Sequence, residues 1–346
     1  MGRTVRILCV LLMVCPFWAS AVEVANLYTA RVDAKLKLND GLAQAFDQVI
    51  VRNSGHRDSL ANVLVSQQRS KVKDYLVQYG NIDEGGKRWL EVAFNQEAID
   101  RLLRQANLPI WGSLRPMTIV WLVEEENFKR ELLNDQSPIL QDSELKVAAR
   151  SRGVPLMLPL LDLDDISTVD PSDIWGQFPG PARQASARYS ADQMVMAKLF
   201  SIGAEQYQLQ WSVYDLSGGP LDVQPAWMSN ALTGDKQTLM MEWLEQMADE
   251  FGAHFATQTG LVAADSVQVI VYNLSDLKRV LEAESSLAGM AIVSQVELQQ
   301  IDGNQAVFNV NLLGPSDDFY RALELDKRLD ALEVAPEELP SYMWKY

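Results

Sequence analysis

The chain has 346 residues, 48% of them hydrophobic and 22% charged, and its formal net charge is −16. This length exceeds what one hydrophobic core usually holds, so we expect two or three domains. The acidic balance repels phosphate backbones and anionic lipid headgroups, and it therefore argues against nucleic acid and membrane surfaces as partners.

The first 21 residues have the three parts of a cleavable signal peptide. Two arginines supply positive charge, residues 7–18 form an apolar run, and Ala19-Ser20-Ala21 is a small-x-small cleavage site. The alternative is an uncleaved anchor, but the run is shorter than the roughly 20 apolar residues that cross a membrane. We therefore predict removal of residues 1–21, a mature protein that begins at Val22 without stable membrane insertion, and a periplasmic location.

Both cysteines, Cys9 and Cys15, lie in the predicted signal peptide. The mature chain would therefore have no disulfide, no thiolate nucleophile and no cysteine metal site. Lipid attachment needs small residues before the cysteine, whereas Cys15 follows Leu12-Met13-Val14. This sequence argues against a lipoprotein.

Residues 22–112 are expected to form an N-terminal α+β module. Residues 22–32 are typical of a strand, and a helix capped by Asn39 or Asp40 would end at Gly55. Residues 72–79 have the spacing of a second amphipathic stretch that stops at Gly80, residues 88–95 indicate a strand, and residues 96–106 indicate a helix.

Residues 113–262 are expected to form a middle α/β module whose mixed sheet is covered by helices. The apolar run 117–123 predicts a buried strand, followed by a helix at 143–152 and a strand at 154–161. Three further strands are predicted at 191–202, 206–216 and 220–232, with a hairpin turn at 217–220 between the last two. A helix at 235–257 has an apolar stripe that would cover one face of the sheet.

Residues 263–346 predict a C-terminal module in the order βαββαβ, as in ferredoxin-like folds. The predicted strands are residues 267–273, 291–301, 305–313 and 341–346, and the helices are residues 275–287 and 316–332. Ser275 and Ser316 are plausible caps, and Asp302-Gly303 indicates a hairpin. The expected fold class is thus α+β or α/β with several modules.

Several segments in a fixed order carry a family resemblance. They are "VEVANLYTARV", "LPIWGSLRPMTIVWLV", "AARSRGVPLMLPLLDLDD", "DIWGQF" and "ASARYSAD". In these segments the chain resembles exported proteins of Gram-negative bacteria grouped as domain of unknown function 2066, over nearly all of the mature chain. The resemblance implies an exported, uncharacterised protein, and it supplies no activity, cofactor or catalytic residue. More loosely, residues 188–219 are similar to small α/β modules of periplasmic accessory proteins.

Catalytic motifs are scarce. His56 and His254 are the only histidines, and neither belongs to an HExxH motif or a closely spaced pair. The sequence also has no G-x-S-x-G elbow, no phosphate-binding loop and no dinucleotide glycine pattern. We therefore predict no catalytic residue, no cofactor and no enzyme, although acid–base chemistry by carboxylates alone stays open.

The segment "LMLPLLDLDDISTVDPSDIW" concentrates aspartates after an apolar run. Asp162, Asp164 and Asp165 are weak candidates for a cation site, but the spacing fails the EF-hand pattern at its fifth, sixth and twelfth positions. We favour helix caps and turns for these residues, together with Asp170 and Asp173, and we expect Arg183 and Arg188 to neutralise them. No tight metal binding is predicted.

Aromatic residues near turns suggest a binding surface instead. Trp111, Trp175, Phe178 and Trp227 lie in or beside turns, where a ring packs on a core edge or contacts a partner. Our candidate partner-binding anchors are Trp111, Arg115 and Trp175. The competing interpretation puts both tryptophans in the core and pairs Arg115 with the acidic segment.

Three functions remain open. The first is a noncatalytic periplasmic protein that binds or assembles an envelope protein complex. The second is a soluble carrier with an apolar cavity between the middle sheet and the helix at 235–257. The third is a hydrolase that uses carboxylates or a metal in the segment 162–173.

Overall fold

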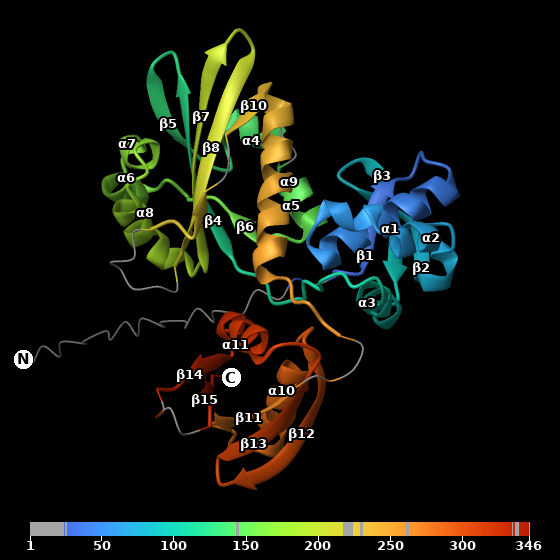
Figure 1. Cartoon of the computed structure of the whole chain (residues 1–346). Helices are drawn as coiled ribbons and strands as arrows, with labels where there is room; N and C mark the ends of the chain where they lie inside the picture. Colours follow the sequence, from blue (N-terminus) through green and yellow to red (C-terminus); the bar gives the residue numbers. More distant parts are fainter. Residues whose placement is uncertain are drawn as a thin grey trace, which may run out of the picture.

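The computed structural model describes residue 24 and residues 26–142, 145–216, 224–228, 231–260, 263, 265–333, 335 and 339–345. These residues form a mixed α and β structure with three sheets, each part of a separate unit (Figure 1). The multi-module α and β fold class is therefore confirmed. The predicted signal peptide lies outside the described residues, among which no helix has the length and apolar character needed to span a membrane.

The N-terminal unit packs helices on one face of a three-stranded antiparallel sheet with the order β1-β3-β2. Its elements are β1 (Thr29–Asp33), α1 (Leu38–Ser54), η1 (Arg57–Ala61), α2 (Val63–Arg69), η2 (Val72–Tyr75), β2 (Leu76–Glu84), β3 (Lys87–Phe94) and α3 (Gln96–Gln105). The first strand begins only at Thr29, and the predicted amphipathic stretch 72–79 is a short 3-10 turn followed by β2. The strand β2 forms because Gly85 and Gly86 fold it back onto β3.

The middle unit has a mixed sheet with helices on both faces. Its strands are β4 (Thr118–Glu126), β5 (Lys129–Leu133), β6 (Leu156–Met157), β7 (Gln193–Gly203), β8 (Gln206–Asp215), β9 (Trp227–Met228) and β10 (Leu232–Gly234). Its helices are α4 (Pro138–Asp142), α5 (Leu145–Arg152), α6 (Leu163–Thr168), α7 (Pro171–Trp175), α8 (Pro179–Ser186), η3 (Ala187–Tyr189) and α9 (Lys236–Phe255). The order is β10-β8-β7-β4-β5, and β4 and β7 are parallel.

Two separate cores lie on the two faces of this sheet. The helices α4, α5 and α9 cover one face, and α6, α7 and α8 cover the other (Figure 1). Within the predicted strand 154–161, only Leu156–Met157 form a strand, β6. The predicted strand 220–232 is described only as β9 and the first residue of β10. Its predicted hairpin turn at 217–220 lies outside the described residues. The hairpin strand β5 was not predicted.

The helix α9 forms as its sequence pattern predicts. The Asp235 side chain caps it by accepting a hydrogen bond from the Thr238 backbone N–H at 3.0 Å. The expected apolar stripe is buried against the sheet, and it consists of Leu239, Met240, Trp243, Met247 and Phe251. This packing fills the space between the middle sheet and the helix.

The C-terminal module keeps the predicted βαββαβ order and adds one strand. Its elements are β11 (Asp265–Tyr272), α10 (Leu277–Ala288), β12 (Val293–Asp302), β13 (Gln305–Leu312), α11 (Ser316–Leu325), β14 (Leu329–Ala331) and β15 (Ser341–Trp344). The sheet order is β12-β13-β11-β15-β14, with β15 parallel to β11 and the additional strand β14 at the edge. The predicted helix 316–332 therefore ends early, because its last residues pair with β15.

One short segment joins all three units. Ile110 packs in the N-terminal core, Trp111 in the core beneath α9, and Leu114 against the C-terminal core. Ile110 and Thr257 also exchange two backbone hydrogen bonds of 2.8 and 2.9 Å. Residues 110–114, which join the N-terminal and middle units, therefore meet the chain between the middle and C-terminal units.

Candidate functional site

The acidic segment is held together by an arginine. Asp162 caps α6 by accepting a hydrogen bond from the Asp165 backbone N–H, and Arg188 donates two hydrogen bonds to the Asp162 carboxylate at 2.8 and 2.6 Å. The same guanidinium lies 3.6 Å from Asp164 and 3.5 Å from Asp165. The hydrogen bonds from Arg188 lower the pKa of Asp162 to about 2.

The other carboxylates of this segment have separate local partners. Asp165 is buried and accepts hydrogen bonds from the Leu161 backbone N–H at 2.9 Å and from the Tyr189 hydroxyl. Burial and this contact raise the pKa of Tyr189 to about 12. Asp170 and Asp173 form a capping box at the start of α7. Among the residues with described positions, no group of three or more His, Cys, Asp or Glu side chains could hold a metal ion.

Trp111 and Arg115 are buried, so neither can reach a partner in this structure. The exposed fraction is 1% for Trp111 and 2% for Arg115, whose guanidinium lies 4.0 Å from the centre of the indole ring. Arg115 donates five hydrogen bonds of 2.8 to 3.0 Å, and the acceptors are the backbone carbonyls of Arg52, Trp111, Gly112, Arg152 and Gly153. Both residues therefore act inside the molecule, and Arg115 does not pair with the acidic segment.

Two further buried arginines join the N-terminal and middle units. Arg52 donates to carbonyls that include Ser151, and Arg152 donates to the Gly55 carbonyl at 3.1 Å and to the Asp249 carboxylate at 2.7 Å. Next to them, a Cβ on Gly252 would lie 2.1 Å from the Gly55 carbonyl oxygen. The C-terminal end of α1 and the helix α9 therefore meet backbone to backbone at Gly55 and Gly252. This region is a structural junction.

Trp175 remains at the surface of the middle unit. The half-buried indole has the Arg130 guanidinium 4.1 Å and the Lys198 ammonium 5.5 Å from its ring centre, and the Phe200 ring lies 5.5 Å away. Phe178, three residues further on, is 62% exposed. Of the three predicted anchors, Trp175 alone lies where a partner can contact it.

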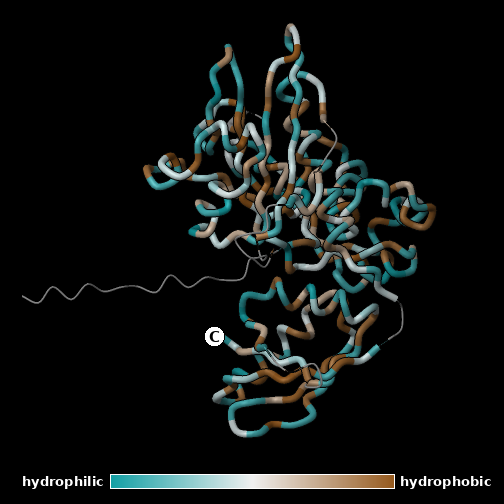
Figure 2. Tube along the Cα trace, turned by 60° about the vertical axis from the view of Figure 1, so that its left-hand side comes forward, coloured by the Kyte–Doolittle hydropathy of each residue, from teal (hydrophilic) through white to brown (hydrophobic). Residues whose placement is uncertain are grey.

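The strands of the middle sheet extend beyond their helical cover on this side. Along β7, Met194 and Met196 are buried beneath α6 to α8, Phe200 is half-buried, and Ile202 is 52% exposed. Figures 1 and 2 both show the β4–β5 and β7–β8 hairpins projecting past the rest of the middle unit. Among the described residues, the helices α6 to α8 leave Phe200 half-buried and Ile202 exposed at this projecting end.

Phe128 lies at the tip of the β4–β5 hairpin and is 99% exposed. Glu125 pairs with Phe200 at the last position of the parallel β4–β7 register, two residues before the turn at 127–128 and two residues before Ile202. We use the name hairpin surface for Phe128, Trp175, Phe178, Phe200 and Ile202. The sequence pattern did not single out Phe128, because the turn lacks the glycine that usually marks a two-residue hairpin.

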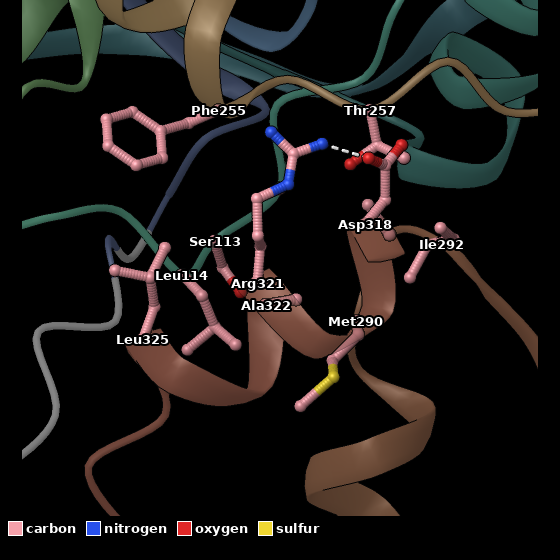
Figure 3. A pocket seen from close by; sticks show the side chains of 12 residues that line it. Ser113, Leu114, Phe255, Thr257, Met290, Ile292, Asp318, Arg321, Ala322 and Leu325 are labelled. Carbon is pink, nitrogen blue, oxygen red and sulfur yellow. Dashed lines mark hydrogen bonds and ion pairs between the residues drawn. The ribbon is translucent and has the colours of Figure 1, made fainter. Parts of the chain in front are cut away.

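A cleft separates the C-terminal module from the joining segments (Figure 3). It lies between residues 112–114, the end of α9 and the helix α11, and Arg321 crosses it to donate to the His254 carbonyl at 3.0 Å and to pair with Asp318. The space for water is about 40 Å³. A few water molecules would fit there, whereas ligand pockets usually measure several hundred Å³. The cleft is thus part of the junction between modules.

Comparisons with known families agree with this modular division. Residues 21–112 match a family described as a domain of unknown function (DUF8605), and residues 264–342 match DUF2066. The motifs on which we based the resemblance lie between residues 22 and 192, so the DUF2066 match is narrower than predicted and covers only the C-terminal module. No curated protein matches the chain. Residues 264–342 therefore carry the predicted likeness to the DUF2066 family, whose description names no activity.

Proposed function

We propose that the protein is exported to the periplasm and acts there as a noncatalytic binding or assembly accessory of an envelope protein complex. Export rests on the signal sequence of residues 1–21. Binding rests on one observation above all, which is the exposure of Phe128, Phe178 and Ile202 on the unit that carries Trp175.

The chemistry of the hairpin surface suits a protein partner. Aromatic side chains bury a large area for few rotatable bonds, and they dominate the energetics of many protein interfaces. The Arg130 guanidinium and the Lys198 ammonium lie 4.1 and 5.5 Å from the centre of the Trp175 ring, and these cation–π contacts restrict its orientation before a partner arrives. Preorganised groups lose less conformational entropy when they bind.

The two alternative functions have less support. A carrier would need a cavity beneath α9, but Trp211, Trp243 and Phe251 fill that space. A hydrolase would need converging carboxylates, whereas Asp162 is bound by Arg188 and Asp170 with Asp173 caps α7. These side chains already have structural partners.

A photoreactive amino acid at position 180 tests the proposal in cells that make the protein natively. Gly180 lies two residues after Phe178, and nothing lies within 4 Å of its Cβ position. Gly80, which has the same open surroundings on β2, provides the matched control. We expect one specific envelope protein to be crosslinked from position 180 and not from position 80. Equal products from both positions, or none, would contradict the proposal.

A further inference from the structure

The turn at the tip of the β4–β5 hairpin holds a phenylalanine where glycine is expected. Glu126 pairs with Lys129, so the turn contains only Asn127 and Phe128, and their φ angles are 52° and 64°. Two-residue turns with both φ angles positive favour Asn-Gly, because a Cβ is unfavourable in the left-handed region. The β2–β3 turn of the same chain uses Gly85 and Gly86 at the equivalent positions.

The fold gains little from this phenylalanine. At 99% exposure its ring is covered by almost nothing, so it stabilises neither the hairpin nor the core. Both the backbone conformation and the exposure are unfavourable for a large apolar side chain. A strained backbone and an exposed apolar ring are retained where the side chain has a role outside folding.

We infer that Phe128 is the anchor with which the hairpin surface enters an apolar pocket of a protein partner. This inference rests on the proposed function, and it names the residue that occupies the centre of the contact. Ile202, near the end of β7, supplies a second apolar side chain, and Trp175 with Phe200 continues the contact toward the helices. The left-handed turn holds the Phe128 ring clear of the strands.

The charges near Phe128 favour a protein pocket with a basic rim over a lipid bilayer. Residues 124–131 and 202–206 contain the carboxylates Glu124, Glu125, Glu126, Glu131 and Glu205. The cations in the same segments are Lys129 and Arg130, while Lys236 pairs with Glu124 and Lys198 lies beside Trp175, so five carboxylates face four cations. The excess of negative charge would repel anionic headgroups, whereas Lys or Arg at the edge of a pocket would complement it.

Substitution of Phe128 by asparagine separates anchoring from folding. Asparagine tolerates the left-handed conformation, and it avoids the extra freedom that glycine gives the unfolded chain. We expect Phe128→Asn to raise the thermal unfolding midpoint by a degree or more, because backbone strain is relieved. A lower midpoint would show that Phe128 supports the fold, and it would overturn the inference.

The binding half of the test uses a photoreactive amino acid at position 205, on the turn of the β7–β8 hairpin. We expect the partner crosslinked from position 180 to be crosslinked from position 205 as well. Adding Phe128→Asn should lower that yield at least tenfold, whereas Phe128→Tyr, which keeps the ring, should preserve most of it. Val63→Ser, which removes an exposed apolar side chain on the N-terminal unit, should leave the yield unchanged.

The outcomes distinguish the inference from the proposed function. If the yield from position 205 is unaffected by Phe128→Asn, Phe128 is not the anchor, while the hairpin surface remains a binding site. If position 180 captures a partner and position 205 does not, the tip is outside the contact and the inference is again wrong. If neither position captures a specific protein, the proposed function itself is contradicted.

Discussion

Arg115 uses all five of its N–H donors on backbone carbonyls, and it does so almost completely out of contact with water. The acceptors come from α1, from the segment that joins the units, and from the end of α5. Burial lowers the pKa of Arg115 well below its usual value, because the charged form is desolvated. The planar guanidinium therefore links three parts of the chain that are distant in sequence.

We predict that Arg115→Lys destabilises the protein by about 3 kcal/mol, because lysine has three donors on one nitrogen and leaves buried carbonyls unsatisfied. Urea unfolding followed by tryptophan fluorescence measures the change. Arg101→Lys on the exposed face of α3 is the matched control and should change the free energy of unfolding by less than about 0.5 kcal/mol. Wild-type stability in Arg115→Lys would contradict the role of this arginine.

Of the individual residues predicted as partner-binding anchors, the sequence placed only Trp175 at the surface correctly. Trp111 and Arg115 lie among Pro109, Gly112 and Pro116, and such turns are usually exposed, so the sequence predicted an interface role for them. Their burial depends on three units meeting at one segment, which no local pattern encodes. Trp175 remains accessible because β5 and β7 extend past α7.

The short helices of the acidic segment show which elements a sequence predicts well. Capping of α6 by Asp162 was predicted and is confirmed, since a cap depends on residues within one helical turn. The strand β2 was misread, because its pairing with β3 is decided by the hairpin and not by its own periodicity. The strand β5 was missed because Phe128 replaces the glycine that normally marks such a turn.

The contact between Asp162 and Arg188 predicts a specific titration. The pKa of Asp162 should be about 2 in the protein, and Arg188→Gln should move it toward the ordinary aspartate value of about 3.9. Because the folded pKa is lowered, the contact stabilises the fold above about pH 4 and is lost as the pH falls toward 2. Carbonyl-detected NMR of the Asp162 carboxyl measures both values. An unchanged pKa in Arg188→Gln would show that the α6 cap alone causes the shift.

At the scale of the whole molecule, the three units meet around residues 110–117. The Val24 backbone N–H donates to the Ser113 carbonyl at 3.1 Å, and Lys327 of the C-terminal module pairs with Asp192 of the middle unit. The sequence predicted the multi-module composition, because strands and helices alternate in recognisable groups. It could not predict the junction, which depends on buried arginines and on the glycine contact between α1 and α9.

The proposed export predicts a defined mature chain. Signal peptidase should cut after Ala21, since Ala19 and Ala21 are the small residues that the enzyme selects. Mass spectrometry of a periplasmic fraction should therefore find an N-terminal peptide that begins at Val22, with no lipid attached. Recovery of the intact chain in the inner membrane would show that the leader acts as an anchor.

The central claim is that the hairpin surface binds an envelope protein, and the affinity of Trp175→Ala for the purified crosslinked partner tests it most directly. We predict binding at least tenfold weaker than that of the wild type, with cooperative unfolding retained, because Trp175 is only half-buried. Trp111→Ala is the contrasting variant, and it should lose about 3–5 kcal/mol of stability because its indole is enclosed in the core. Wild-type affinity in a folded Trp175→Ala protein would contradict the account.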